Sequence, residues 1–278
     1  MVSHPPSPVL VNPRAERVKA VRALARRSVR ERTGLFLAEG PQSVREAVRC
    51  QPGWVRDVYV TGDGQTRHPE IVETARAAGL FVHECSDEVL AAMCDTDAPQ
   101  GLLAVCRVVT TSLEDLLAEA PRLLLVLTNV RDPGNAGTVL RGADAAGADA
   151  IIVSDNSVDV FSPKVIRSTA GSVFHLPVVT GIPVPEILTA LEATGITTLA
   201  ADGAGAMLVG DAPLARPHAW IMGNEAWGLE PSVRDACDHV VRLPIYGRAE
   251  SLNLAMACLL YTSPSPRDRT RSRMPSSA

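Results

Sequence analysis

Three short polar segments in the last half of the sequence hold the residues whose types and spacing could support chemistry. They are Asn129–Arg141, Ile221–Leu229 and Leu243–Ala257. Each combines glycines, which permit tight turns, with amide, carboxylate, hydroxyl or guanidinium side chains. A guanidinium stays protonated, so it can clamp a phosphate or orient a hydroxyl but is a poor base. The three segments together predict a polar reaction site.

In the first segment, Asn135 and Arg141 are the candidate functional residues. Pro133 and Gly134 form a turn that predicts a helix over residues 136–146, and Asn135 lies where an N-cap belongs. Capping of the free N–H groups would explain Asn135 without any catalytic role. Arg141 follows within an apolar, small-residue helix, where it could simply extend its charge to water. A chemical and a structural role stay open for both.

The second and third segments offer two further pairs of candidates. Gly223 follows a predicted strand and permits close approach of the backbone to a ligand. Glu225 is expected at a helix start, where a carboxylate also interacts favourably with the helix dipole. Ser251 and Asn253 are expected in a helix that begins at Glu250. Ser251 could be only a first-turn polar residue, whereas Asn253 is harder to explain by helix propensity.

Apolar runs precede all three segments and predict the elements that position them. Near-continuous apolar strands are covered on both faces, as in a parallel sheet. Because the carboxyl ends of parallel strands lie at one edge of the sheet, the three segments are expected to converge there. The predicted strands of this half cover residues 123–129, 150–154, 174–179, 197–201, 219–222 and 240–245.

Taken in this order, the segments resemble the three signature motifs of the SpoU (TrmH-like) RNA ribose 2′-O-methyltransferases, of the SPOUT class. The resemblance spans residues 10 to 257, and three ordered motifs are far harder to match by chance than one. It implies an α/β protein with a C-terminal, trefoil-knotted, parallel-sheet methyltransferase domain and a smaller N-terminal α/β RNA-binding domain. It also implies S-adenosyl-L-methionine as cofactor, ribosomal or transfer RNA as substrate, and a homodimer.

Roles for single residues follow from their match to the family's motifs. The resemblance implies a catalytic site lined by Asn135, Arg141, Glu225, Ser251 and Asn253. It implies a cofactor site, held largely by backbone groups, at Met222, Gly223, Leu243, Ile245 and Leu252. Between the first two motifs, Lys164 and Arg167 also match the family's pattern and are given an RNA-facing role.

The first third of the chain predicts a separate small α/β domain. We expect this RNA-binding domain over residues 10–108, a linker over 109–121 and the methyltransferase domain over 122–257. Residues 14–32 read as one basic helix with eight Arg or Lys and two Glu, a local net charge of +6. Such a run is either a solvated helix face or an RNA-phosphate footprint. The methyltransferase motifs favour RNA contacts by Arg22, Arg26, Arg27 and Arg30.

Composition excludes several other classes of protein. No apolar run approaches the ~18 residues of a membrane helix, and the first residues do not resemble a secretion signal, so a cytoplasmic location is expected. The six cysteines form no pair or Cys/His cluster with metal-ligand spacing, so no metal site is predicted. The sequence has no GxGxxG after a strand, no P-loop and no GxSxG elbow. Dinucleotide-binding, nucleotide-hydrolysing and serine-hydrolase functions therefore lack support.

The last residues, 258–278, change character abruptly to Ser, Pro and Arg. They resemble a translated sequencing adapter, so we interpret them as an artefactual disordered tail and exclude them from functional reasoning. The sequence as a whole predicts S-adenosylmethionine-dependent methylation of a ribose 2′-hydroxyl in RNA, most readily ribosomal RNA. The alternative is a non-catalytic RNA-binding protein of the same fold.

Overall fold

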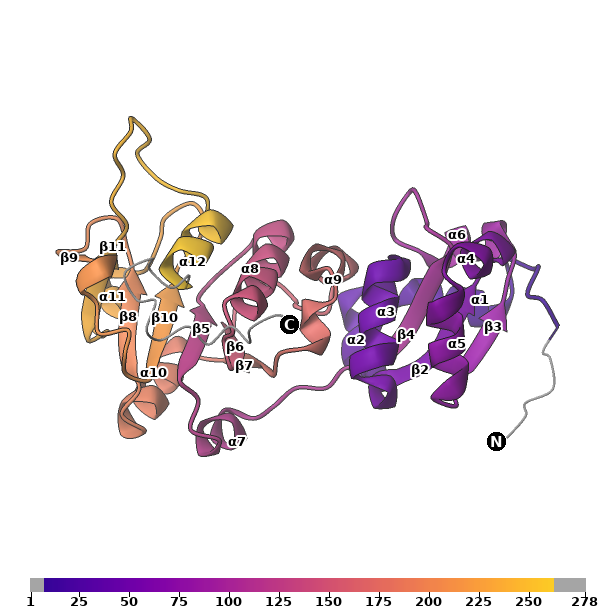
Figure 1. Cartoon of the computed structure of the whole chain (residues 1–278), viewed down its shortest axis with the longest axis horizontal. Coiled ribbons are helices and arrows are strands. Elements are labelled where there is room, and N and C mark those ends of the chain that lie inside the picture. The colour runs from indigo at the N-terminus through magenta and orange to yellow at the C-terminus, as the bar shows by residue number, and fades with distance from the viewer. Residues whose placement is uncertain (1–7, 263–278) are drawn as a thin grey trace, which may run out of the picture. The chain divides into compact units, whose positions relative to one another are not determined.

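The computed structural model describes residues 8–262, and this part of the chain forms two compact units (Figure 1). The first unit holds the residues up to Val109 together with Asp159–His175. The second holds Thr110–Val158 and the residues from Leu176 onward. Residues 159–175 lie within the range predicted for the methyltransferase domain, yet they pack with the first unit.

A four-stranded mixed sheet forms the centre of the first unit. Its order is β1-β4-β2-β3, with β1 and β2 antiparallel to β4 and with β3 parallel to β2. The strands are β1 (Leu35–Glu39), β2 (Val55–Val60), β3 (Phe81–Glu84) and β4 (Leu102–Arg107). The helices are α1 (Glu16–Ala23), α2 (Arg27–Thr33), α3 (Gly40–Cys50), α4 (Gly62–Arg67), α5 (Pro69–Ala77), α6 (Asp87–Met93) and α9 (Pro163–Thr169), with 3₁₀ turns η1 (Pro52–Trp54) and η2 (Ser172–Phe174). The predicted small α/β unit is confirmed.

The basic stretch 14–32 forms two helices, so the prediction of one continuous helix is wrong. An extended residue, Arg26, separates α1 from α2. The break buries Leu24, which is 3% exposed, in the core of this unit. The guanidinium of Arg30 stabilises the break, because it donates to the carbonyls of Leu24 and Ala25, both at 2.7 Å. These are carbonyls that a helix end leaves without a partner.

A seven-stranded parallel sheet forms the centre of the second unit, as predicted. Its order is β7-β6-β5-β10-β8-β11-β9, and every pairing is parallel. The strands are β5 (Leu123–Leu127), β6 (Ala150–Ser154), β7 (Val178–Ile182), β8 (Thr197–Ala201), β9 (Met207–Leu208), β10 (His218–Met222) and β11 (His239–Arg242). One predicted strand, 174–179, is displaced. Its first residue, Phe174, is the last residue of the turn η2, and His175, expected in the strand, lies between η2 and β7.

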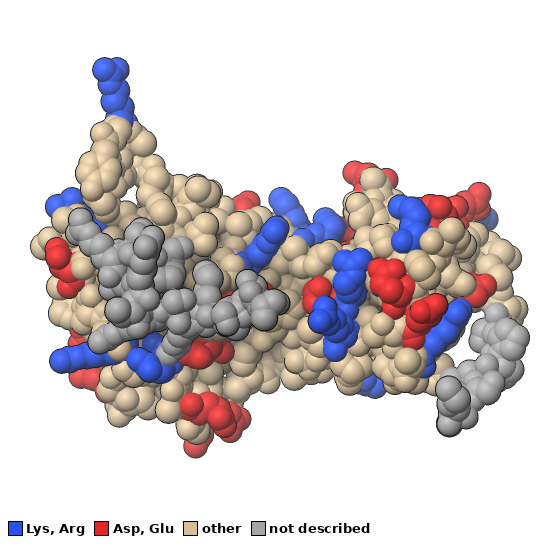
Figure 2. Space-filling model, viewed as in Figure 1, with Lys and Arg blue, Asp and Glu red and all other residues tan. Residues whose placement is uncertain are grey.

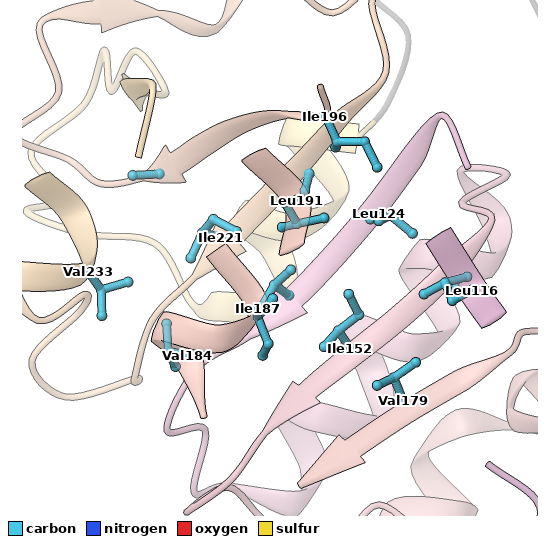
Figure 3. Close-up of a cluster of buried hydrophobic side chains, with 14 of the residues drawn as sticks. Leu116, Leu124, Ile152, Val179, Val184, Ile187, Leu191, Ile196, Ile221 and Val233 are labelled. Carbon is cyan, nitrogen blue, oxygen red and sulfur yellow. The ribbon is translucent and has the colours of Figure 1, made fainter. Parts of the chain in front are cut away.

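Helices cover both faces of this sheet. In Figure 1, α8 (Pro133–Ala145) and α12 (Leu254–Thr262) lie on one side, and α7 (Leu113–Ala118) and α10 (Val184–Ala193) lie on the other. Figure 3 shows Ile187 and Leu191 of α10 against strand residues such as Leu124, Ile152 and Ile221. Short elements η3 (Val209–Asp211) and α11 (Pro231–Asp235) complete the unit. The apolar side chains of alternate strand residues thus enter two separate cores.

Helix α12 includes residues that the sequence assigned to the disordered tail. Cys258 is fully buried, and the phenol of Tyr261 packs 4.5 Å from the indole of Trp220, between ring centroids. The Tyr261 hydroxyl donates to the carbonyl of Val241 at 2.9 Å. Residues 258–262 are therefore helical and packed, contrary to the prediction of disorder. The predicted tail residues 263–278 lie outside the described residues.

The helices found between residues 8 and 262 are all too short or too polar to cross a membrane.

Candidate active site

The first two polar segments meet because they follow neighbouring parallel strands. Met222, the last residue of β10, pairs with Leu127, the last residue of β5. Just beyond, Thr128 donates to the carbonyl of Met222 through its backbone N–H at 2.8 Å and its hydroxyl at 3.1 Å. The carboxyl ends of β5 and β10 therefore present both segments at one edge of the sheet, as the sequence predicted.

The second segment forms a closed turn. Asn224 and Gly228 exchange two backbone hydrogen bonds, each of 2.9 Å. A Cβ atom on Gly223 would lie 2.3 Å from the carbonyl carbon and oxygen of Gly228, so only glycine fits there. The predicted helix start at Glu225 is wrong, because this residue lies in the turn and the next helix, α11, begins later.

The side chain of Asn224 joins this turn to the first segment. It is 6% exposed, and its Nδ2 donates to the carbonyl of Asn129 at 2.7 Å. Its Oδ1 accepts the N–H of Ala226 at 2.8 Å. Asn129 itself has φ +53°, a left-handed conformation that asparagine tolerates better than most residues. Asn224 belongs to the second polar segment but was not among the predicted site residues. Its burial and its hydrogen bonds show that it joins the second segment to the first.

Glu225 binds the N-terminus of α8. Its carboxylate accepts the backbone N–H groups of Arg131 and Asp132, each at 3.2 Å, and the side-chain amide of Asn135 at 3.4 Å. The expected interaction of Glu225 with a helix dipole thus exists, but the helix belongs to the first segment. Glu225 thus interacts with the start of α8, far earlier in the chain, and not with a helix that begins at Glu225 itself.

The N-cap of α8 is Asp132, so the prediction of Asn135 as N-cap is wrong. Asp132 Oδ1 accepts the N–H of Asn135 at 2.7 Å, and Pro133 occupies the first helical position, which needs no N–H donor. Because Asp132 caps the helix, the amide of Asn135 is available for other partners. Its Oδ1 accepts a hydrogen bond of 3.0 Å from Nδ2 of Asn253.

Asn253 brings the third segment into the same network. It precedes α12, which begins at Leu254 and not at Glu250 as predicted. Its Oδ1 accepts the N–H groups of Ala255 at 2.9 Å and Met256 at 3.4 Å, as an N-cap does. The chain of contacts Asn253–Asn135–Glu225 therefore connects all three polar segments.

Arg141 and Ser251 lie outside this network. Six residues along an α-helix correspond to about 1.7 turns, so Arg141 leaves α8 on a different side from Asn135. Both Arg141 and Ser251 are exposed. Among residues 8–262, neither side chain has a hydrogen-bond partner. The polar groups of Arg141 and Ser251 are therefore open to solvent.

The predicted cofactor residues lie on the segment that follows β11. Residues 244–252 form no helix or strand, and within the described chain they make no backbone-to-backbone hydrogen bond. Ile245 and Leu252 are 40% and 39% exposed, whereas Met222 is 1% exposed at the end of β10. Because most of this segment is exposed, its N–H and C=O groups can bond water and are open to a ligand. The segment is thus suited to hold a flat polar ligand such as adenine through its backbone.

The predicted RNA-facing arginines divide into exposed and structural ones. Arg22 and Arg26 are exposed, and Arg27 is exposed but bonds Glu31 at 2.8 Å. Arg30 is 4% exposed and donates through Nε to Asp159 at 3.0 Å, so it does not fit an RNA-binding role. On the face drawn in Figure 2, basic and acidic side chains alternate over the first unit.

The other two residues with a predicted RNA-facing role, Lys164 and Arg167, also divide into an exposed and a structural one. Lys164 is exposed, whereas Arg167 donates to Glu39 and to Asp95, each at 3.0 Å. The carboxylates therefore neutralise much of the charge that the sequence assigned to RNA contacts.

Loss of the Asp159 carboxylate should destabilise the first unit. Asp159→Ala leaves the buried charge of Arg30 without its ion-pair partner, which costs about 3 kcal/mol. Urea denaturation should show this loss, with RNA affinity of the folded protein unchanged. The matched control is Glu31→Ala, which removes an exposed pair with Arg27 and should cost less than about 1 kcal/mol. Equal losses for the two variants would contradict the structural role of Arg30.

The six cysteines lie in the described part of the chain and form no disulfide there; three are buried, two are half-buried and Cys50 is exposed. Burial raises the pKa of Cys85 and of Cys258 to about 12, so these thiols stay protonated. One group spans distant segments: ligand atoms of Glu46, Cys50 and His175 lie within 4.8 Å of one another. Sequence spacing alone did not show this cluster. Glu46 already accepts hydrogen bonds there, since its Oε2 lies 3.2 Å from His175 Nε2.

Comparisons with known proteins match the same two units. The sequence model of the SpoU rRNA Methylase family matches residues 122–263, and that of the MRM3-like substrate binding domain matches residues 15–104. The chain is 35% identical over 245 residues to the 23S rRNA (guanosine(2553)-2′-O)-methyltransferase RlmP of Bacillus subtilis, covering 88% of this chain and 94% of the relative. It is 31% identical over 259 residues to the 23S rRNA (uridine(2479)-2′-O)-methyltransferase of Streptomyces viridochromogenes, covering 90% and 88%.

A solved structure is similar over nearly the whole length. The AdoMet-bound rRNA methyltransferase from Sinorhizobium meliloti superposes with a TM-score of 0.79 at 30% identity, covering 92% of this chain and 95% of that one. The sequence resemblance is thereby confirmed.

Proposed function

We infer that this chain, which belongs to the SpoU rRNA Methylase family, is an S-adenosyl-L-methionine-dependent RNA ribose 2′-O-methyltransferase. The observation that carries this inference is the contact chain Asn253–Asn135–Glu225, which joins the three polar segments at one edge of the parallel sheet. Three of the five proposed catalytic residues, Asn135, Glu225 and Asn253, thus contact one another.

We propose that the substrate is ribosomal RNA, specifically RNA of the large subunit. Relatives that match most of this chain are named as 23S rRNA methyltransferases, and residues 15–104 match a substrate-binding domain. Those relatives are named for different target bases, a guanosine and a uridine. The target base is therefore not carried over to this chain.

When bound, the cofactor would supply an electrophilic methyl group on a sulfonium: the ribose 2′-oxygen bonds to the methyl carbon in line as the carbon–sulfur bond breaks and the thioether leaves. We propose that backbone groups of Leu243, Ile245 and Leu252 hold the cofactor, together with Met222 and Gly223. The open backbone of residues 244–252 and the close approach at Gly223 fit this role.

The polar residues would divide the remaining work. Arg141, exposed and without a described partner, would bind the phosphate beside the target ribose and orient its 2′-hydroxyl. Ser251 would offer a second hydrogen bond to the substrate. Glu225, Asn135 and Asn253 would keep the three segments in register, since their groups already bond one another.

Further properties of the family are proposals for this chain. We propose a trefoil knot formed by the segments around α12, and a homodimer that uses the same face. Ile245, Tyr246 and Met256 support the dimer, because they are 40%, 94% and 58% exposed and would be buried by a partner. A cytoplasmic location follows from the proposed ribosomal substrate.

Calorimetry should detect one S-adenosylmethionine or S-adenosylhomocysteine site per chain and no binding of NAD or ATP. The reason is that the backbone groups of residues 244–252 are open to a ligand, whereas the sequence has no phosphate-binding loop of the kind that binds ATP or NAD. The preparation should be compared with one whose residues after Ala257 follow independently sequenced genomic DNA, because the adapter resemblance begins at Cys258. Absence of binding in both would favour the non-catalytic RNA-binding alternative.

A further inference from the structure

A pocket of about 450 Å³ opens at one end of the sheet in the first unit. It lies where β2 and β3 begin and β4 ends, and all of its lining residues belong to this unit. Three arginines line it: Arg17 from α1, Arg56 from β2 and Arg107 from β4. None of these was among the predicted RNA-binding residues.

A buried carboxylate at the back of the pocket positions these groups. Asp57 is 5% exposed, and it accepts hydrogen bonds of 2.9 Å from Arg56 Nε and from His83 Nε2. Burial alone would raise the pKa of Asp57, but the hydrogen bonds of His83 and Arg56 outweigh it and lower the pKa to about 2. The carboxylate is therefore charged, so the proton lies on Nε2 of His83. Nδ1 of His83 then faces Arg17, whose NH1 lies 3.5 Å away.

A β-bulge turns Arg56 toward the pocket. Along β2 and β4, Val55 pairs with Cys106 and Asp57 pairs with Val105, which leaves Arg56 as the extra residue. Bulges of this kind redirect a side chain and are frequent next to functional sites. Arg56 donates to Asp57 through Nε only, and its side chain is 48% exposed. Its two terminal nitrogens have no hydrogen-bond partner in the described part of the chain.

An aromatic side chain borders the arginines. Phe81 is 53% exposed, and its ring lies nearly parallel to that of His83, with 6.5 Å between centroids and 6° between planes. An exposed phenyl ring beside guanidinium groups combines the two features by which proteins bind single-stranded nucleic acid. These are cationic groups for the backbone phosphate and a flat face for a base.

We propose that this pocket binds one nucleotide of single-stranded RNA, with its phosphate against Arg56 and Arg107 and its base on Phe81. The proposal rests on the proposed function in that it names a further contact of the RNA substrate. Three guanidinium groups face a single carboxylate, so an excess of positive charge remains for the phosphate. A duplex would not fit the pocket, since its bases are stacked and paired inside the helix.

Binding of a single-stranded oligouridylate of about ten nucleotides tests this pocket. Fluorescence anisotropy should show at least about tenfold weaker binding for the double variant Arg56→Gln, Arg107→Gln. The slope of the logarithm of the binding constant against the logarithm of the salt concentration should fall by about 0.7 in magnitude, since one phosphate contact is lost. Phe81→Ala should weaken binding about fivefold or more. The control is Arg67→Gln, Arg76→Gln, which removes two ion-paired arginines of the same unit whose side chains are each 49% exposed, and it should change affinity less than about threefold.

Several outcomes would overturn the proposal. They are equal losses for the pocket and control variants, unchanged affinity for Phe81→Ala, or equal binding of the oligouridylate and of an RNA duplex of the same length. Uridine monophosphate binding as tightly as the oligomer would assign the pocket to a free nucleotide instead. Calorimetry with S-adenosylmethionine on the same proteins separates this test from that of the enzyme. If the proposed function is wrong, neither the parent protein nor any variant will bind the cofactor. If only the pocket proposal is wrong, all of these proteins will still bind the cofactor.

Discussion

Replacement of Arg141 by alanine is expected to lower methyl transfer to RNA by about a thousandfold, because a positioned charge-stabilising donor is worth that much in an active site. Affinity for S-adenosylmethionine should stay within about tenfold, or ~1.4 kcal/mol. The side chain is exposed on α8 and has no hydrogen-bond partner among residues 8–262, so the fold does not depend on it. Single-turnover transfer of labelled methyl groups into ribosomal RNA, with calorimetry for the cofactor, measures both quantities.

Two matched variants sharpen this result. Arg141→Lys keeps the charge but loses the planar fork, and we expect it to recover only part of the rate. Arg234→Ala removes another partly exposed arginine of the second unit, one that bonds its neighbour Asp235, and should leave transfer unchanged. Near wild-type transfer by Arg141→Ala would show that the family role does not apply to this position.

Replacement of Gly223 by alanine should abolish cofactor binding and methyl transfer together. The new Cβ would lie 2.3 Å from the backbone of Gly228 and 2.5 Å from the nitrogen of Leu229, and backbone atoms cannot move aside as a flexible side chain does. Opening the turn displaces Asn224, which bonds the carbonyl of Asn129, and Glu225, which binds the backbone at the start of α8. We expect S-adenosylmethionine affinity to fall at least about a hundredfold, or ~2.7 kcal/mol, in calorimetry.

The control for this variant is Gly210→Ala, where the added Cβ meets no atom within 4 Å. It should bind the cofactor as the parent protein does. Circular dichroism should show that Gly223→Ala remains folded, because the strand β10 that precedes the turn keeps its partners β5 and β8. A folded Gly223→Ala protein with normal cofactor affinity would remove this turn from the proposed cofactor site.

Local patterns allowed much of the fold and the location of the site to be predicted from the sequence. The apolar runs predicted β6 and β8 with their observed bounds, and they predicted a parallel sheet because both faces of such strands must be covered. The order of the three polar segments predicted the family. Their convergence followed from the rule that the parallel strands of one sheet end at the same edge.

Only the tertiary structure determined which groups those residues bind. Glu225 accepts N–H groups 94 and 93 residues away, and Asp132, not Asn135, caps α8. Arg30 is a buried structural residue because Asp159 lies 129 positions further on in the same unit. The arginine pocket of the first unit likewise collects side chains from three separate elements. Periodicity and capping patterns report on neighbours in the chain, whereas burial and charge pairing depend on which distant segments the packed core brings together.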